Sequence, residues 1–277
     1  MRDPQRDGDA GISSVGTPTR IPTVPTTRWC AMKAVRLHEH GKLPVVEEVP
    51  EPAVTSPLDV IVKVGGAGLC RTDIDLVENR WVGMQGTRLP YTLGHENAGW
   101  VHDIGSGVTN VAPGDAVILH PLVNCGLCRA CRTGNDRHCE RARTPGIDTD
   151  GGMAELVMTN ATSVVKLPLA LDPTSIAVFA DAGLAAYQAV KSALSVVPPG
   201  SCVVVLGGDA LAQIGLQCAT ALSPHETVLV DYSDWGTSSD AGAQEGAKAE
   251  RQRINAVLDS TGGRGAHLVL DFLKVVP

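Results

Sequence analysis

The chain has 277 residues, enough for about two domains at roughly 150 residues each. Apolar residues make up 43% of the sequence and charged residues 19%, values close to those of ordinary globular proteins, so disorder along the whole length is excluded. The net charge of −7 and the aromatic content of 3% exclude a nucleic-acid partner, because such surfaces are basic and present stacking side chains.

No apolar run approaches the roughly 20 residues of a membrane helix, and no apolar signal-peptide core follows the N-terminus. We therefore expect a cytoplasmic protein without a membrane partner. In that reducing compartment, the eight cysteines are expected to be metal ligands, thiolates or buried side chains rather than disulfides.

The first part of the chain reads as a disordered extension over residues 1–31. Its prolines, among them Pro18, Pro22 and Pro25, interrupt a polar stretch that has no period of 2 or 3.6 residues. Ordered structure is expected from Met32. Between residues 33 and 166, short apolar runs alternate with Gly and Pro, which predicts a small β-rich barrel with strands at 60–64, 100–104, 116–119 and 154–159.

After Asp181 the pattern changes to strands that alternate with helices. It predicts a helix at 182–193, a buried strand at 202–206, a second helix, a strand at 228–231 and a later strand at 267–272. This alternation is typical of a doubly wound parallel sheet. Residues 235–249 are rich in Gly, Ser and Asp and show no apolar face, so they predict neither a helix nor a strand.

Four cysteines lie close together in a loop: Cys125, Cys128, Cys131 and Cys139. Four thiolates satisfy a tetrahedral Zn²⁺ completely and leave no open coordination position, so zinc here would fix the loop rather than catalyse. Disulfides, unrelated buried cysteines and an iron–sulfur cluster are the alternatives.

A second set of chemically versatile residues is spread along the chain in three segments. The first is Cys70-Arg71-Thr72-Asp73, the second contains His95 and Glu96 between Gly94 and Gly99, and the third is Asp181. A lone Cys is most often buried packing, and a His beside a Glu is most often a surface pair. The three segments together are far less easily explained by chance.

These residues resemble those of the zinc-dependent medium-chain alcohol dehydrogenases. The run 94–99 with Gly105 and Val108 is similar to that family's zinc signature, and the four cysteines lie where the family has them. The resemblance covers the chain from Met32 onward. It implies an α/β protein with a GroES-like zinc-binding catalytic domain at 32–181 and part of a doubly wound (Rossmann) NAD-binding domain at 182–277.

By this resemblance, Cys70, His95 and Asp181 ligate a catalytic Zn²⁺, and Glu96 lies beside it, able to join or exchange with the open position. Asp181 matches the third-ligand variant of bacterial secondary-alcohol dehydrogenases. Three protein ligands leave one place for water or substrate, whose hydroxyl the cation makes more acidic. The implied reaction is hydride transfer from an alcohol to NAD, giving a ketone or aldehyde, with secondary alcohols as the expected substrates.

The resemblance also assigns roles to two neighbours of Cys70. Thr72 accepts the proton of the substrate hydroxyl and passes it along the cofactor ribose. Asp73 fixes the tautomer of His95 as a hydrogen-bond acceptor, and an ordinary turn-forming Asp is its alternative.

The cofactor half departs from the family pattern at the turn after the strand 202–206. Gly207 supplies the tight turn and Ala212 is an allowed third position, but Asp209 replaces the glycine that lets backbone N–H groups reach the pyrophosphate. The carboxylate adds bulk and a like charge beside the phosphates. Arg71 resembles the family's pyrophosphate-contacting residue and offsets part of that cost.

Asp231 follows the next strand of this half. Its distance from Gly207 is near the roughly 20 residues expected for the acid that binds the adenosine ribose hydroxyls, which favours NAD over NADP. An ordinary capping Asp is the alternative.

Other departures concern the relay residues and the end of the chain. Ala185 stands where the family usually has a Thr against the nicotinamide, and Asp75 where some members have a His.

Family members continue through a second half-sheet and return to complete the catalytic domain, so about half of the doubly wound domain is expected here. The subunit contact of the homo-oligomeric family, made through the last strands, would then be absent. An incomplete or inactive zinc-binding remnant of such a dehydrogenase is the alternative function.

Overall fold

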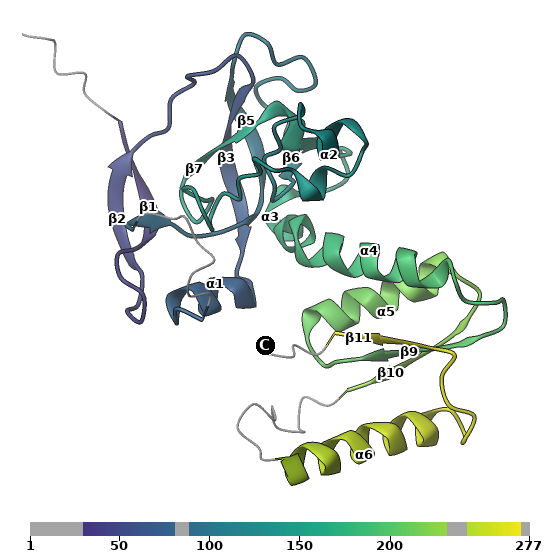
Figure 1. Ribbon diagram of the computed structural model, residues 1–277. Coiled ribbons are helices and arrows are strands. Elements are labelled where there is room, and N and C mark those ends of the chain that lie inside the picture. The colour runs from purple at the N-terminus through teal and green to yellow at the C-terminus, as the bar shows by residue number, and fades with distance from the viewer. Residues whose placement is uncertain (1–29, 81–88, 232–242, 273–277) are drawn as a thin grey trace, which may run out of the picture.

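The computed structural model describes residues 30–80, 89–231 and 243–272. Two units follow one another along the chain (Figure 1), a β-rich unit and a parallel sheet with helices on both faces. This confirms the α/β fold class with a barrel and a partial doubly wound sheet. The boundary that the sequence places near Asp181 coincides with the start of the first long helix and stays a prediction.

The β-rich unit is built on a five-stranded antiparallel sheet with the order β7-β3-β5-β6-β8. Alternate apolar residues of β3, Val60 and Val62, are fully buried and pack with Val101 and Val117 in one core, as expected from the period of a strand. The strands are β3 (Asp59–Gly68), β5 (Glu96–Ile104), β6 (Ala116–Leu119), β7 (Leu156–Asn160) and β8 (Val164–Lys166).

A smaller antiparallel sheet closes the β-rich unit on one side. Its order is β2-β1-β4, formed by β2 (Val45–Pro50), β1 (Ala31–Leu37) and β4 (Tyr91–Thr92). The N–H of Val35 in β1 donates to the carbonyl oxygen of Met153 at 2.8 Å, which ties this sheet to the segment before β7.

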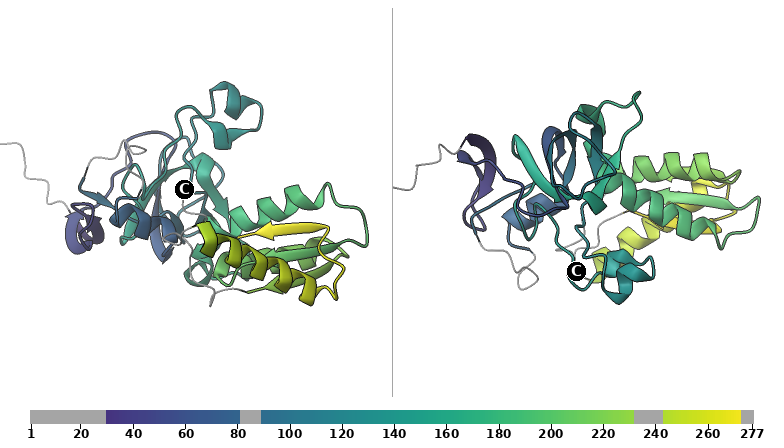
Figure 2. Two further views of the ribbon diagram at one scale, coloured as in Figure 1. Left: turned by 60° about the horizontal axis from the view of Figure 1, so that its bottom comes forward. Right: turned by 90° about the horizontal axis from the view of Figure 1, so that it is seen from above.

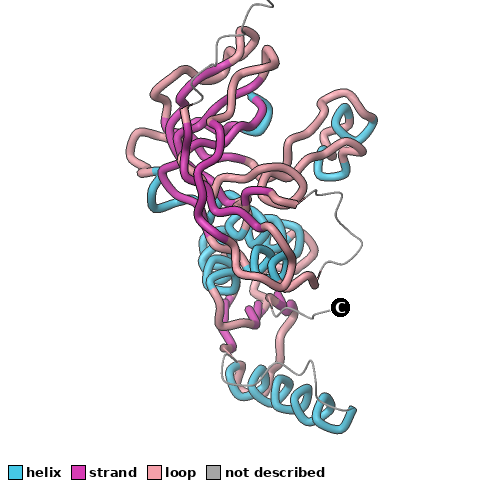
Figure 3. The backbone as a smooth tube through the Cα atoms, turned by 90° about the vertical axis from the view of Figure 1, so that its left-hand side faces the viewer, coloured by secondary structure: helices cyan, strands magenta, loops and turns pink. Residues whose placement is uncertain are grey.

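Short helices connect the strands of the β-rich unit. They are α1 (Arg71–Val77), α2 (Arg129–Arg132), η1 (Asp136–His138), η2 (Ala161–Ser163), α3 (Pro173–Ile176) and η3 (Ala177–Ala180). The loop that carries α2 and η1 projects from the barrel (Figures 2 and 3).

The second unit is a parallel sheet with the order β10-β9-β11, formed by β9 (Cys202–Leu206), β10 (Glu226–Val230) and β11 (Leu268–Asp271). Helices α4 (Ala182–Leu194) and α5 (Ala210–Leu222) cover one face, and α6 (Ala243–Ser260) lies on the other (Figure 1). Val203 and Val205 of β9 pack toward α4 and α5, whereas Val204 packs with the cluster that includes Val257 of α6. Burial on both faces explains why β9 reads as a continuous apolar run.

The structure corrects two expectations. Helix α6 begins at Ala243, inside the stretch 235–249 where the sequence predicted no helix; residues 232–242 lie outside the described part. Among the side chains of α6 that the structure describes, Ala256 and Val257 pack against the sheet, and both lie beyond residue 249. Strand β1 begins at Ala31 because Ala31 pairs with Pro50, so the ordered chain starts before Met32; residues 1–29 lie outside the described part.

None of the helices in the described ranges has the length and apolar content needed to cross a bilayer.

Strands β3 and β5, which carry the residues discussed below, approach closely at Gly99. A Cβ atom at Gly99 would lie 2.0 Å from the carbonyl oxygen of Lys63, a backbone atom that cannot easily move aside. The glycine is therefore required by the pairing of the two strands.

We expect Gly99→Ala to destabilise the protein by about 1–3 kcal/mol, because overpacking forces the two strands apart. Thermal unfolding followed by circular dichroism measures the change as a lower midpoint. Gly114→Ala is the control, since Gly114 has φ +91° but open space around it. The drop in its unfolding midpoint measures backbone strain without a steric clash. A midpoint for Gly99→Ala equal to that of the wild type would contradict this account.

Candidate active site

Four side chains from three segments of the chain converge where the two units meet. Cys70 precedes α1, His95 and Glu96 lie at the start of β5, and Asp181 precedes α4. Their ligand atoms all lie within 4.8 Å of one another, and His95 and Glu96 are buried. The structure thus brings together the three segments that the sequence left far apart, and we call these four residues the mixed group.

Asp73 holds two members of the mixed group. Its Oδ2 accepts the backbone N–H of Cys70 at 2.9 Å, and its Oδ1 lies 3.4 Å from Nδ1 of His95. Asp73 is itself only 1% exposed, so water competes little for its carboxylate. This is the placement expected of a residue that orients a metal-binding imidazole through its second nitrogen.

His95 sits in a strongly negative environment. Its Nε2 lies 3.5 Å from Oδ2 of Asp181, opposite the contact of Nδ1 with Asp73. Burial by itself lowers the pKa of His95, but Asp181, Asp73 and Cys70 offset this effect and raise it to about 12. The surroundings of the ring therefore stabilise a positive charge.

The thiol of Cys70 responds to the same environment. Burial by itself raises its pKa, yet the contact with His95 and hydrogen bonds from the backbone and side chain of Thr72 bring the pKa below the ordinary value. Thr72 therefore favours the thiolate form of its neighbour Cys70. A thiolate is the form of cysteine that binds a metal ion.

Glu96 connects the mixed group to α4. Its Oε1 accepts the backbone N–H of Ala182 at 3.1 Å. A Cβ atom at Gly68 would lie 2.1 Å from Oε2, so the glycine of β3 makes room for the carboxylate. Burial raises the pKa of Glu96, although the hydrogen bond from Ala182 works in the opposite direction.

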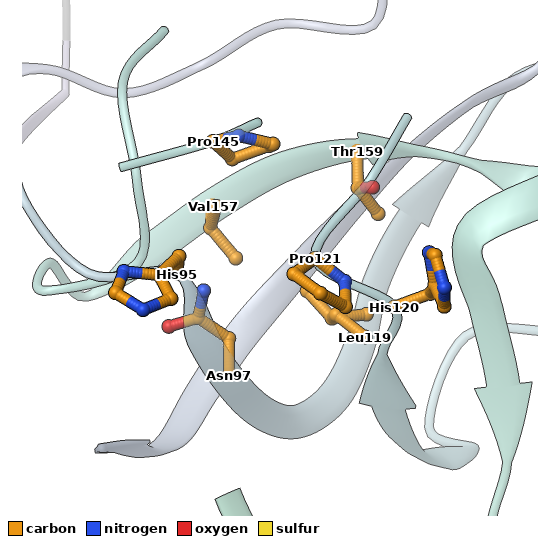
Figure 4. A pocket seen from close by; sticks show the side chains of 8 residues that line it. All are labelled: His95, Asn97, Leu119, His120, Pro121, Pro145, Val157 and Thr159. Carbon is orange, nitrogen blue, oxygen red and sulfur yellow. The ribbon is translucent and has the colours of Figure 1, made fainter. Parts of the chain in front are cut away.

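A small hollow lies on the barrel side of His95 (Figure 4), next to the amide of Asn97 and the hydroxyl of Thr159. Its volume of about 10 Å³ suits one water molecule rather than a substrate. The Nδ2 of Asn97 donates to the carbonyl oxygen of Gly94 at 3.1 Å, which fixes the turn before His95. The remaining walls are Leu119, His120, Pro121, Pro145 and Val157.

The projecting loop holds the second cysteine group, whose four sulfur atoms also lie within 4.8 Å of one another; its members are Cys125, Cys128, Cys131 and Cys139. Backbone N–H groups point at the sulfurs: Cys128 donates to Cys125 at 3.3 Å, and Arg141 donates to Cys139 at 3.4 Å. Hydrogen bonds from the backbone of Leu127 and Cys128 lower the pKa of Cys125 to about 6. We call residues 125–139 the four-cysteine lobe.

Both groups fit a zinc ion by the chemistry of their donors. In the four-cysteine lobe, four sulfurs within reach of one ion match a closed tetrahedral site. In the mixed group, the neighbours of His95 stabilise a positive charge at the ring. A divalent cation bound there would supply that charge in place of a ring proton. If Cys70, His95 and Asp181 are the ligands, a fourth position stays open for a further ligand, within reach of the carboxylate of Glu96.

The turn expected to bind the cofactor has the strand–turn–helix form. Gly207 follows β9 with φ +139°, and a Cβ atom there would lie 2.8 Å from Cβ of Ala212, so strand and helix pack closely. Asp209 is the N-cap of α5, and its Oδ1 accepts the N–H of Ala212 at 3.1 Å. Asp231 directly follows β10 and is exposed. Arg71, exposed on α1, pairs through Nε with Oδ1 of Asp75 at 3.0 Å.

Three contacts were not predicted from the sequence. The backbone N–H of Ala182 as a partner of Glu96 has no local signal, because the two residues are 86 positions apart. The pairing of Arg71 with Asp75 could have been found from their spacing of four residues on a helix. The capping by Asp209 could have been found from its place directly before a helix.

Residues 56–169 match the family of the alcohol dehydrogenase GroES-like domain. The chain is 31% identical over 248 residues to an NAD-dependent alcohol dehydrogenase of Sulfurisphaera tokodaii, which covers 87% of this chain and 71% of the relative. It belongs to the zinc-dependent medium-chain alcohol dehydrogenase family.

Solved structures of this family agree with the fold. The alcohol dehydrogenase of Aeropyrum pernix superposes with a TM-score of 0.76 at 38% identity, over 87% of this chain and 72% of the other. A cobalt- and zinc-bound alcohol dehydrogenase of Pyrobaculum aerophilum superposes with a TM-score of 0.65 at 26% identity, over 87% and 66%.

If the two groups each hold one metal ion, metal analysis of this dehydrogenase family member should find two zinc ions per chain. Cys70→Ser should remove one ion and leave the four-cysteine lobe filled, and Cys128→Ser should remove the other. Inductively coupled plasma mass spectrometry of the purified variants measures this. Loss of both ions, or of neither, from Cys70→Ser would refute the assignment.

Asp73→Ala should weaken zinc binding at the mixed group by about 10- to 100-fold, because Cys70 and His95 lose the carboxylate that orients them. Competition with a chromogenic chelator measures the affinity. Asp103→Ala is the matched control, since Asp103 also lies on β5 but is exposed. An unchanged affinity in Asp73→Ala would show that the ligands are held in place without it.

Proposed function

We propose that this protein is a zinc- and NAD-dependent alcohol dehydrogenase that converts small, secondary alcohols to ketones and the reverse. The observation that carries the proposal is the mixed group, in which the ligand atoms of Cys70, His95, Glu96 and Asp181 lie within 4.8 Å of one another. The name of the Sulfurisphaera tokodaii relative supports the choice of an alcohol as substrate and NAD as cofactor.

Cys70, His95 and Asp181 would hold the catalytic zinc, and the four-cysteine lobe would hold a second, structural zinc. A zinc ion at the mixed group supplies a Lewis acid that makes a bound hydroxyl group more acidic. Glu96 stays within reach of the same position while its carboxylate caps α4.

The remaining residues of the site orient groups and move a proton. Asp73 holds the imidazole of His95 and the backbone of Cys70 in one arrangement. The hydroxyl of Thr72 helps to lower the pKa of the neighbouring Cys70 thiol, so it would lie near a bound substrate hydroxyl, accept the proton released there and pass its own along the cofactor ribose. The burial of His95 and Glu96 keeps bulk water from these groups.

The cofactor would lie along the carboxyl edge of the parallel sheet. Gly207 and Ala212 allow the close turn before α5, and Asp231 follows the neighbouring strand, where it would bind the ribose hydroxyls of the adenosine half. Arg71 would contact the pyrophosphate from the barrel side. The nicotinamide of the bound cofactor supplies the acceptor for the hydride.

The function is tested by following NADH absorbance with the zinc-loaded chain and a panel of small secondary alcohols. Thr72→Ala should lower kcat by about 100-fold or more, because the proton acceptor is lost. The zinc content of the variant should stay at the wild-type value. Thr162→Ala is the control, since Thr162 lies in η2 with its hydroxyl bonded to Asn160. A wild-type kcat in Thr72→Ala would contradict its role, and no NADH from any alcohol would contradict the function.

A further inference from the structure

The N-terminus of α5 is closed by a side chain of its own turn. Asp209 adopts an extended conformation with φ −87° and ψ 177°, which directs its carboxylate back over the first turn of the helix. Oδ1 accepts the N–H of Ala212 at 3.1 Å, and the carbonyl oxygen of Asp209 accepts the N–H of Gln213 at 3.1 Å. An anion bound at this helix terminus would use the same N–H of Ala212.

The carboxyl edge of the sheet adds further negative charge. Asp231 follows the end of β10 and Asp271 ends β11, and both strands pair with β9 at Leu206, directly before Gly207. Asp209, Asp231 and Asp271 are all exposed. Three carboxylates therefore lie at the carboxyl ends of three neighbouring strands, and that of Asp209 caps the helix terminus where a dinucleotide would place its phosphates.

Asp75 pairs with Arg71, the other residue that is expected to contact the pyrophosphate. Nε of Arg71 lies 3.0 Å from Oδ1 of Asp75, four residues along α1. The side chain of Arg71 is 43% exposed, and ion pairs of this kind on a helix are weak. Asp75 is therefore expected to change dinucleotide affinity by about twofold, far less than Asp209.

We propose that Asp209 is the residue that sets the cofactor affinity of this chain, because its carboxylate occupies the helix terminus that the cofactor's pyrophosphate would use. Binding of a dinucleotide then requires the carboxylate to leave the N–H of Ala212 and to remain close to two phosphate charges. This inference rests on the proposed function and concerns one residue of its cofactor site.

The test is a fluorescence titration of NADH with the full 277-residue chain and two variants. Asp209→Gly removes both the competing carboxylate and its bulk and should tighten NADH binding by about tenfold or more. Asp209→Asn keeps a capping side chain without the charge and should tighten binding by a smaller factor. Asp172→Gly and Asp172→Asn are matched controls, because Asp172 caps α3 through the N–H of Thr174 at 3.0 Å and removing it changes the net charge equally.

Thermal unfolding without NADH supplies a readout that does not depend on the cofactor. Asp209→Ala should unfold at a lower temperature than the wild type because α5 loses its cap, although the same variant should bind NADH more tightly. A stability loss without tighter binding would show that Asp209 is only a cap and would overturn the proposal.

The outcomes separate this inference from the proposed function. Wild-type binding of NADH that is unchanged in Asp209→Gly overturns the role of Asp209 and leaves the cofactor assignment intact. Absence of NADH binding in the wild type and its recovery in Asp209→Gly supports the role of Asp209. Absence of binding in both proteins, with zinc present, contradicts the cofactor assignment and the role of Asp209 together.

Discussion

The hydrogen bond from the N–H of Ala182 to Oε1 of Glu96 joins the parallel-sheet unit to the barrel. Asp181 holds the N-cap position of α4, yet its carboxylate faces Nε2 of His95 instead of capping the helix. Glu96 takes over the helix terminus and so leaves Asp181 available to the mixed group. A carboxylate of the barrel therefore anchors the N-terminus of α4, the helix on which α5 and the sheet are packed.

In both units, carboxylates of the chain itself lie beside a group of positive charge: His95 in the barrel and the N-terminus of α5 in the parallel-sheet unit. In the barrel, Asp73 and Glu96 are each 1% exposed and lie around His95, an arrangement that is costly unless a positive charge balances it. In the second unit, the positive end of the α5 dipole faces Asp209. The two places have opposite effects on ligands. The buried carboxylates around His95 attract a cation, whereas the exposed carboxylate of Asp209 repels an anion.

The sequence predicted the elements with a clear period and the residues with a distinctive spacing. The buried run of β9 and the cysteines of the lobe belong to these. Helix α6 was not predicted because residues 235–249 show no apolar face in the sequence, whereas the apolar contacts that the structure describes for this helix, at Ala256 and Val257, lie beyond that stretch. The link between Glu96 and Ala182 could not be predicted, since a contact across 86 residues depends on how two units pack and not on any local pattern.

The four-cysteine lobe has almost no apolar core of its own. Residues 126–138 are exposed or half-buried, and the stem is closed by Val123 and Arg143, whose backbone groups bond to each other at 2.7 and 3.0 Å. Few buried contacts hold such a segment, so its folded conformation depends on what the four sulfur atoms bind. Loss of an ion held by the four sulfurs would open the lobe as a separate cooperative unit, while the amide protons of the barrel strands stay protected from exchange.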